Sequence, residues 1–156
     1  FDLFGDIIGT EGPLPNPSLG IIDVLQKEDP SKIKVTCSSI AQGTPDIFIS
    51  KASGASCWTQ NQPYSWFCVD LGNRRVVPTE YQFGYGSPGN SVCPKNWLLQ
   101  ATNELNPGTR VDDPTWVTLR THQNDRTFNS SWAVARWPIT NPRSESGYRM
   151  FRIIQT

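Results

Sequence analysis

The feature that most constrains the fold is a series of short segments in which apolar and polar residues alternate. In one of them, Phe67, Val69 and Leu71 fall on one face, and the residues between them fall on the other. Turn-forming Gly, Pro, Asn and Asp residues separate the segments, which are 32–39, 66–72, 74–86, 96–104, 116–125, 131–140 and 148–156. The pattern predicts an all-β chain, folded as an antiparallel sandwich of two packed sheets.

Helical spacing is confined to one place, the stretch NPSLGIIDVLQKEDP. It predicts at most one short helix near residues 19–28, which begins close to Ser18 as a cap and ends before Pro30. Within the strand-like segment 74–86, Pro78 cannot donate a ladder hydrogen bond. That segment is therefore expected to be an edge strand or to contain a bulge.

Length and charge limit the classes of function. The chain has 156 residues, enough for one domain with a real core, and its 14 basic and 14 acidic residues cancel. A neutral balance gives no reason to expect nucleic acid as a partner. No apolar run approaches the ~20 residues of a membrane-spanning helix, and FDLFGD lacks the basic and apolar parts of a signal peptide. We expect a part of a longer chain, with an intracellular location slightly favoured over secretion.

Four cysteines, Cys37, Cys57, Cys68 and Cys93, are consistent with two different redox states. An even number permits two disulfides in any of three connectivities, which is typical of a secreted protein. A chain of this length needs no covalent staples, so free thiols are the preferred interpretation. Their spacing, with His122 as the one histidine, does not match a zinc site.

Asp70 at the end of WFCVD admits a catalytic and a structural interpretation. As a general base it needs a partner acid or nucleophile, and its segment offers none. As a structural acceptor it bonds backbone N–H groups of the next turn or pairs with Arg74 or Arg75. The structural role is the prediction.

Other titratable residues are also expected to be non-catalytic. A Ser-His-Asp triad would need His122, with Asp125 nearby, but no GxSxG-type elbow exists. His122 is therefore predicted to bond a neighbouring backbone group or to face solvent. The pair Asp112–Asp113 precedes a proline, as a turn initiator does, and neither this pair nor Asp46 has the ligand spacing of a calcium loop. We predict no metal and no cofactor.

Several segments together resemble a known family. The segments CWTQNQPYSWFCVDLGNRRVVPTEYQFGYGS, NWLLQATNE, WVTLRTHQND and YRMFRIIQT appear in the order of a discoidin domain, also called a coagulation-factor type C domain. The match covers roughly residues 33–156 and is most similar to a subtype found in intracellular multidomain proteins, beside BTB or ubiquitin-ligase domains. The resemblance implies a galactose-binding-like jelly roll of about eight strands, with a binding surface of loops at one end and no catalysis.

The chain departs from this family in two ways. The family continues with a closing strand that ends in an aromatic residue and a glycine, and here only Phe1–Gly5, at the opposite terminus, looks like it. We expect Phe1–Gly5 to lie beside the first strand of the sandwich, at 32–39, or to belong to a preceding repeat. Residues 1–31 are accordingly predicted to be an extension and residues 32–156 the discoidin-like domain. No cysteine follows Cys93, so the terminal disulfide of secreted members has no counterpart.

The resemblance also suggests where a ligand would bind. A loop that mixes an aromatic ring with amides suits a small ligand. The candidate ligand-binding residues are Trp58, Gln60, Asn61, Tyr64, Thr44, Asp46, Asn90 and Ser91, with a contribution from Asn124 to Asn129. Trp97, Trp116 and Trp137 open or end strands and are predicted to be core. Arg149 and Arg152 are predicted to be structural, and a regular strand would place them on opposite faces.

Two functions remain open at this stage. The preferred one is a non-catalytic module for protein recognition or assembly within a larger protein. The alternative is a carbohydrate-binding, lectin-like module that uses the same loops. A hydrolase is not expected because no nucleophile, base and acid can be combined. Membrane binding ranks low because the loops, apart from DIFIS, contain few consecutive large apolar residues.

Overall fold

The structure is a computed structural model that describes residues 1–9, 19–52, 54–86, 93–130, 132–140 and 145–156. Eight strands and one α-helix occur in these ranges: β1 (Asp2–Ile7), α1 (Ile21–Glu28), β2 (Lys34–Cys37), β3 (Trp66–Asp70), β4 (Val76–Gly84), β5 (Trp97–Thr102), β6 (Val117–His122), β7 (Val134–Pro138) and β8 (Met150–Gln155). Two short 3₁₀ helices, η1 (Pro30–Lys32) and η2 (Pro45–Ile49), complete the fold. No helix among the described residues is long and apolar enough to span a membrane.

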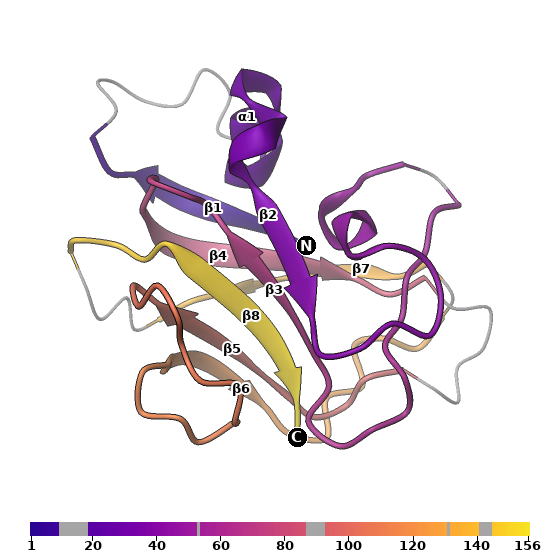
Figure 1. The fold of residues 1–156 in the computed structure, drawn as a ribbon. Helices are drawn as coiled ribbons and strands as arrows, with labels where there is room; N and C mark the ends of the chain where they lie inside the picture. The colour runs from indigo at the N-terminus through magenta and orange to yellow at the C-terminus, as the bar shows by residue number, and fades with distance from the viewer. Residues whose placement is uncertain (10–18, 53, 87–92, 131, 141–144) are drawn as a thin grey trace.

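The strands form two antiparallel sheets that pack face to face (Figure 1). One sheet has three strands in the order β1-β4-β7, and the other has five in the order β2-β3-β8-β5-β6. The predicted all-β sandwich of about eight strands with one short helix is therefore confirmed. Each predicted strand segment contains one of the strands β2 to β8.

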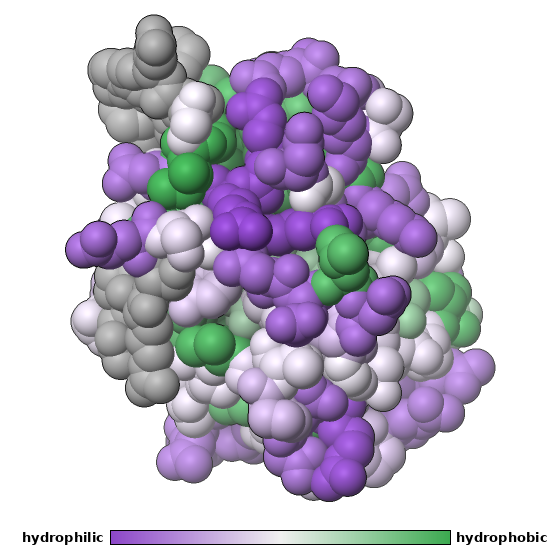
Figure 2. All heavy atoms as spheres, turned by 60° about the vertical axis from the view of Figure 1, so that its left-hand side comes forward, coloured by the Kyte–Doolittle hydropathy of each residue, from purple (hydrophilic) through white to green (hydrophobic). Residues whose placement is uncertain are grey.

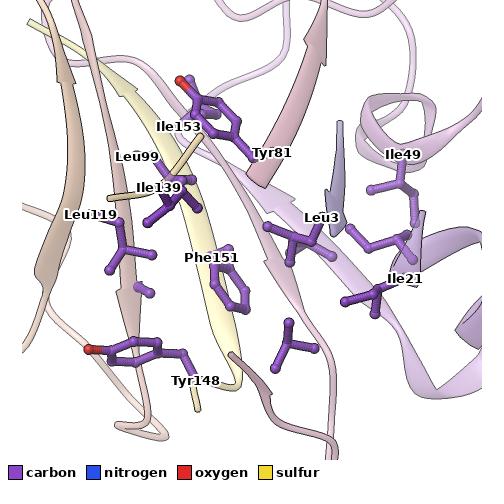
Figure 3. Close-up of a cluster of buried hydrophobic side chains, with 14 of the residues drawn as sticks. Leu3, Ile21, Ile49, Tyr81, Leu99, Leu119, Ile139, Tyr148, Phe151 and Ile153 are labelled. Carbon is purple, nitrogen blue, oxygen red and sulfur yellow. The ribbon is translucent and has the colours of Figure 1, made fainter. Parts of the chain in front are cut away.

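The core lies between the sheets, as Figure 3 shows. Leu3 and Tyr81 come from the three-stranded sheet, and Leu99, Phe151 and Ile153 face them from the five-stranded sheet. Burying each such side chain contributes roughly 1.5–3 kcal/mol. The core explains why the alternating segments predicted the fold class.

Alternation in β3 divides its side chains between two clusters, as predicted. Val69 and the following Leu71 are buried in the main core. Cys68 on the opposite face packs with Trp116 and Met150 in a second, smaller cluster, against which Trp66 also lies. The outer face of the five-stranded sheet is thus covered by the β5–β6 connection that carries Trp116.

Strand β1 occupies an edge of the three-stranded sheet. It pairs antiparallel with β4 and not with the 32–39 strand, so the pairing expected for Phe1–Gly5 is wrong. The register shifts at Gly5, whose backbone has φ +143° and where a Cβ atom would lie 2.2 Å from the Val77 carbonyl oxygen. This bulge lies opposite Pro78, so the bulge expected near Pro78 is confirmed, although β4 is the central strand of its sheet.

Helix α1 is anchored by a residue of β1. Its N-cap is Gly20, which supplies no side-chain hydrogen bond, and the expected cap Ser18 lies outside the described residues. The buried Asp2 carboxylate accepts hydrogen bonds from the Ile22 N–H (2.9 Å) and the Leu3 N–H (2.8 Å), and it pairs with Lys51 (2.8 Å). A remote side chain thus satisfies a free N–H of the first helical turn. The helix ends before Pro30, as predicted.

Candidate functional site

Three connections meet at one end of the sandwich, on the right-hand side of Figure 1. We call this the loop end and define it as the described residues of 38–65 (β2–β3), 85–96 (β4–β5) and 123–133 (β6–β7). Of the predicted ligand-binding residues, six lie in the β2–β3 connection and are exposed: Thr44, Asp46, Trp58, Gln60, Asn61 and Tyr64. Asn90 and Ser91 lie outside the described residues.

Backbone hydrogen bonds hold Trp58 in place. Its N–H donates to the Gln42 carbonyl (3.1 Å), and its carbonyl accepts from the Ala41 N–H (2.9 Å). Two residues later, the Gln60 N–H donates to Ser39 Oγ (3.1 Å). The indole nevertheless stays 45% exposed. A fixed backbone with an exposed ring is suited to stacking on a ligand, because little ordering entropy is lost on contact.

The same connection is anchored to the core through η2. Phe48 is buried and stacks with Phe1 (5.1 Å between ring centroids) and Phe67 (4.9 Å). Thr44 and Asp46 stand at the start of η2 and remain exposed. The anchor therefore fixes the backbone beside these two residues while leaving their side chains available.

Tyr64 is a second exposed aromatic residue, 55% accessible. Its φ of 59° lies in the left-handed region, which is unusual for a bulky residue. The next residue, Ser65, is buried and donates from Oγ to the Gln62 carbonyl (2.9 Å). The turn that presents Tyr64 is thereby tied down.

Trp132 is an exposed aromatic residue that the sequence analysis did not select. It is 53% exposed, and its φ is 62°. A Cβ atom on Gly86 would lie 3.0 Å from Cζ3 of Trp132 and 3.7 Å from Cβ of Ser56. Residues of all three loop-end connections therefore come together around Gly86.

A sequence signal for this position exists in FGYG. Phe83 and Tyr85 pack against the core, so the glycines that alternate with them point outward. Gly84 at the end of β4 and Gly86 just after it have no side chains, and the exposed Val134 and Trp132 lie against them. Alternating Gly and aromatic residues in a strand predict such a bare outer face.

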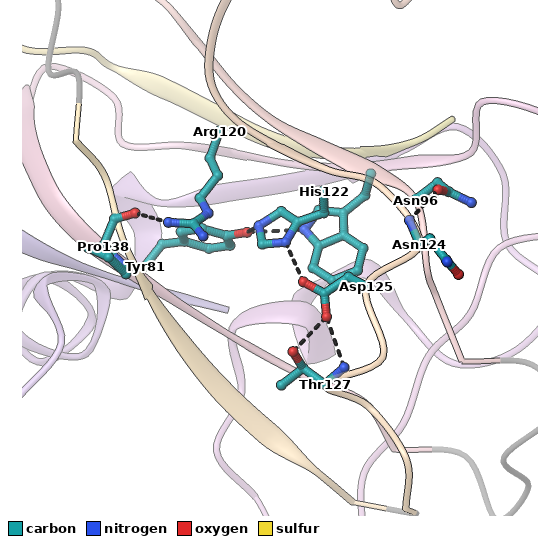
Figure 4. Close-up of polar contacts among 9 residues, drawn as sticks. Tyr81, Asn96, Arg120, His122, Asn124, Asp125, Thr127 and Pro138 are labelled. Carbon is teal, nitrogen blue, oxygen red and sulfur yellow. Dashed lines mark hydrogen bonds and ion pairs between the residues drawn. The ribbon is translucent and has the colours of Figure 1, made fainter.

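His122 belongs to a buried polar chain beneath the loop end (Figure 4). Its Nε2 lies 2.5 Å from Tyr81 Oη, and its Nδ1 lies 2.7 Å from Asp125 Oδ2. Trp97 Nε1–H donates to the same Tyr81 oxygen (3.0 Å) and its ring stacks on the imidazole (4.1 Å). His122 is 3% exposed, so the expected backbone contact or solvent exposure is wrong.

A bulge explains this error. The β5–β6 register shifts between Leu99 and Gln100, so Leu99 faces Arg120 and Gln100 faces Thr118. The extra residue reverses the alternation of β6 and turns His122 inward, opposite Trp97. A strict period of two would have placed His122 on the outer face.

Asp125 joins His122 to two of the loop-end connections. Burial raises the pKa of its carboxyl, but hydrogen bonds from Thr127 and His122 outweigh burial and lower it overall. The Asp125 N–H donates to the Lys95 carbonyl (2.8 Å), and the Asn124 N–H donates to Asn96 Oδ1 (2.8 Å). Within the stretch Asn124 to Asn129, Asn124 and Asp125 thus hold the loop-end connections together.

The opposite end of the sandwich carries ion pairs. Asp70 accepts from the Gly72 N–H (2.9 Å), which is the turn contact expected of it, but its ion partner is Arg149 (2.7 and 2.8 Å). Arg74 pairs instead with Glu28 (2.7 Å), so the expected pairing of Asp70 with Arg74 or Arg75 is wrong. Figure 2, which brings this side forward, shows mainly hydrophilic side chains with scattered hydrophobic ones.

Arg152 is buried below the β5–β6 connection. It donates to Gln100 Oε1 (2.8 Å) and to the carbonyls of Thr109 (3.0 Å) and Arg110 (2.7 Å), and it lies over the Trp116 ring (4.2 Å). Burial lowers the pKa of Arg152 to about 10, so the guanidinium stays charged at neutral pH.

The two arginines do not lie on opposite faces. Arg149 precedes β8 and pairs with Asp70 of β3. Arg152 lies opposite Cys68 of β3. Asp70 and Cys68 are on the same outer face of β3, so both arginines lie on that face. The expected alternation does not hold because Arg149 is outside the regular strand. The three tryptophans predicted to be core, Trp97, Trp116 and Trp137, are all buried.

The remaining candidates show no catalytic or metal-binding arrangement. Asp112 pairs with Arg110 (2.8 Å), and Asp113 accepts from the Thr115 N–H (2.9 Å) as a turn residue does. Within the described ranges, no three His, Cys, Asp or Glu side chains come together as metal ligands. Cys37, Cys57, Cys68 and Cys93 are unpaired in the structure.

Among the known proteins that are similar in sequence, two match part of their own length. A stretch of 111 residues, 70% of the chain, is 32% identical to the E3 ubiquitin-protein ligase Ufd4 of Drosophila melanogaster and spans 4% of it. A stretch of 132 residues, 80% of the chain, is 29% identical to a BTB/POZ domain-containing protein of Arabidopsis thaliana and spans 15% of it. The chain thus corresponds to a small part of each relative. No family model matches the chain.

Solved structures with the same architecture include a bacterial one. CpGH89CBM32-6 of Clostridium perfringens superposes with a TM-score of 0.55 at 14% identity, over 84% of this chain and 86% of that one. Its name marks it as a carbohydrate-binding module of family 32. The chain has this galactose-binding-like β-sandwich fold.

Proposed function

We propose that the chain is a non-catalytic recognition domain that binds a protein partner through its loop end, as part of a larger multidomain protein. The observation that carries the proposal is the exposure of Trp58, Tyr64 and Trp132 on constrained backbones at that end. Trp and Tyr dominate the binding energy of protein interfaces. The sequence relatives, both far longer than the chain, support the multidomain setting.

We infer that the domain is not catalytic from the hydrogen bonds and the burial of His122. Both imidazole nitrogens are engaged by Tyr81 and Asp125, and the ring is buried among aromatic side chains. Burial also raises the pKa of Tyr81, which keeps the phenol protonated. A general base must reach the proton of a bound substrate, and this imidazole cannot.

A glycan is the second candidate ligand, and a specific observation favours it. The Trp132 ring lies against the Gly86 backbone and is half exposed, an arrangement that suits stacking on the apolar face of a sugar ring. Gln60 and Asn61, exposed in the β2–β3 connection, offer amides to hydroxyl groups. The fold of the carbohydrate-binding module supports this alternative by analogy alone.

Photo-crosslinking tests the proposal. A photoreactive amino acid replaces Tyr64 at the loop end or, as a matched control, Leu105, which is 66% exposed at the opposite end. In the full-length protein, we expect the group at position 64 to crosslink to a defined protein. Adding Trp58→Ala and Trp132→Ala should abolish this adduct, and the group at position 105 should give none. Equal adducts from both positions would contradict the proposal.

Calorimetry with neutral and acidic oligosaccharides separates the two candidates. If binding of an oligosaccharide gives saturable heat that Trp132→Ala abolishes and Leu105→Ala retains, the ligand of the loop end is a glycan and not a protein. Absence of heat with every oligosaccharide, together with the position-64 adduct, would leave the protein partner as the ligand.

A further inference from the structure

The buried chain below the loop end has a definite direction of hydrogen bonding. Trp97 Nε1–H can only donate, so the Tyr81 oxygen accepts from it. The phenol proton of Tyr81 is then available for His122 Nε2, which must accept. The imidazole proton therefore sits on Nδ1 and is donated to the Asp125 carboxylate. One arrangement, with a neutral His122, satisfies every donor.

A second proton on His122 breaks this arrangement. Protonated Nε2 becomes a donor to Tyr81, whose oxygen then accepts from both Trp97 and His122. The phenol proton loses its acceptor, and among the described residues Tyr81 Oη is paired only with these two. Tyr81 is fully buried, so water cannot replace the lost acceptor without local opening.

The surroundings of His122 come from five segments. Two contribute charge: Asp125 from the β6–β7 connection favours the protonated ring, and Arg120 of β6 disfavours it. The other three contribute Tyr81 of β4, Trp97 of β5 and Trp137 of β7, which exclude water. Desolvation is the largest effect, and it lowers the pKa of His122 below its ordinary value of 6.5.

The β6–β7 connection depends on this chain for part of its attachment. Asp125 holds His122 with one carboxylate oxygen and the Thr127 N–H (2.8 Å) with the other. The connection then continues through the buried Phe128 toward Trp132. A change at His122 is therefore transmitted first to the backbone that leads to the exposed indole.

We propose that protonation of His122 loosens the β6–β7 connection, so that binding at the loop end weakens as the solution is acidified. This inference rests on the proposed function of the loop end for its effect on binding, but not for the structural change. The sign follows from linkage. The unfolded chain takes up the proton more readily than the folded one, so the stabilisation is present above pH 6.5 and is lost as the pH falls below it.

The structural change can be tested without any ligand. His122 is the one histidine of the chain, so its ring nitrogens give a single set of NMR signals in ¹⁵N-histidine-labelled protein. We expect the neutral Nδ1–H tautomer at neutral pH and a titration midpoint below 6.5. Exchange of the Asp125 and Thr127 amides, corrected for intrinsic rates, should accelerate at least tenfold relative to that of Leu99 as His122 titrates. A midpoint at or above 6.5, or unchanged relative exchange, would overturn the proposal.

A matched variant identifies the phenol as the cause. Tyr81→Phe removes the hydroxyl proton that loses its acceptor when His122 is protonated, so the acceleration of the Asp125 and Thr127 amides on titration should be smaller than in the unmodified chain. Thr121→Ser, next to His122 but exposed, serves as the control and should leave that acceleration unchanged. If Tyr81→Phe does not fold, the tautomer and midpoint of the unmodified chain still decide the question.

Binding measurements separate this inference from the proposed function. If the loop amides respond to His122 while neither adduct nor heat is found at the loop end, the proposed function fails and the proton-dependent loosening stands. If a ligand binds equally well above and below the His122 midpoint that the NMR titration gives, the regulatory inference fails and the function stands.

Discussion

The two ends of the sandwich differ in the side chains that they expose to solvent. At the loop end, large aromatic side chains are exposed and the polar groups are buried beneath them, in the chain from Trp97 to Asp125. At the opposite end, charged pairs such as Asp70–Arg149 and Glu28–Arg74 lie near the surface and tie connections together. The difference indicates which end is equipped to contact a partner and which serves mainly to close the fold.

The largest expected effect lies at the opposite end, with Arg152→Ala. Removing the guanidinium leaves the buried Gln100 and the carbonyls of Thr109 and Arg110 without their donor and removes packing from Trp116. We expect the free energy of unfolding to fall by about 3–4 kcal/mol. Urea denaturation measures the loss, and Arg110→Ala, which removes a solvent-exposed pair, is the control with little effect. A loss equal to that of the control would contradict the assigned role of Arg152.

The next largest effect tests the support of the loop end, with Asp125→Asn. The variant loses the anionic acceptor of His122 and should be destabilised by about 1–2 kcal/mol at neutral pH. Without Asp125 the pKa of His122 falls further below 6.5, so loss of stability should continue to lower pH than in the unmodified chain. Urea denaturation at a series of pH values measures both quantities. Parallel pH profiles for the two chains would show that Asp125 does not act through His122.

A smaller effect is expected for the surface pair of the opposite end. Asp70→Asn weakens a two-point contact with Arg149 that is about four-fifths buried on the Asp70 side. We expect a loss of about 1 kcal/mol, and a coupling of similar size in a double-mutant cycle with Arg149→Gln. Additive losses in the cycle would mean that Asp70 acts mainly through its bond to the Gly72 N–H.

The smallest effect on stability, and the sharpest contrast between the ends, should come from Trp132→Gly. The indole is half exposed, and glycine tolerates its φ of 62° without strain. The free energy of unfolding should change by less than about 1 kcal/mol, while the position-64 adduct or the oligosaccharide heat disappears. A loss of stability comparable to that of Arg152→Ala would show that Trp132 supports the fold instead of contacting a ligand.

The sequence predicted features that depend on neighbouring residues. Alternation predicted that Val69 and Cys68 lie on opposite faces of one pleated strand, and the structure places Val69 in the main core and Cys68 in the smaller cluster. Trp97 and Trp137 were assigned to the core because they open or end predicted strands, and both are buried. The length of the chain was enough to expect free thiols, since a core of this size needs no covalent support.

Features that depend on distant partners were not predicted. Asp70 was assigned to nearby arginines, but its partner Arg149 is 79 residues away and approaches through the β3–β8 pairing. His122 was misplaced by a bulge, which leaves no clear mark in the alternation of its own strand. The pairing of β1 with β4 joins segments that are about 75 residues apart. None of these partners can be found from the local period of the chain.

The glycine beneath Trp132 means that the inclination of the exposed indole is set from behind. A methyl group on Gly86 would lie 3.0 Å from Cζ3 of the ring, so the indole would have to move by a few tenths of an ångström. Under the proposed function, Gly86→Ala would therefore change affinity by displacing the contact residue behind which it lies.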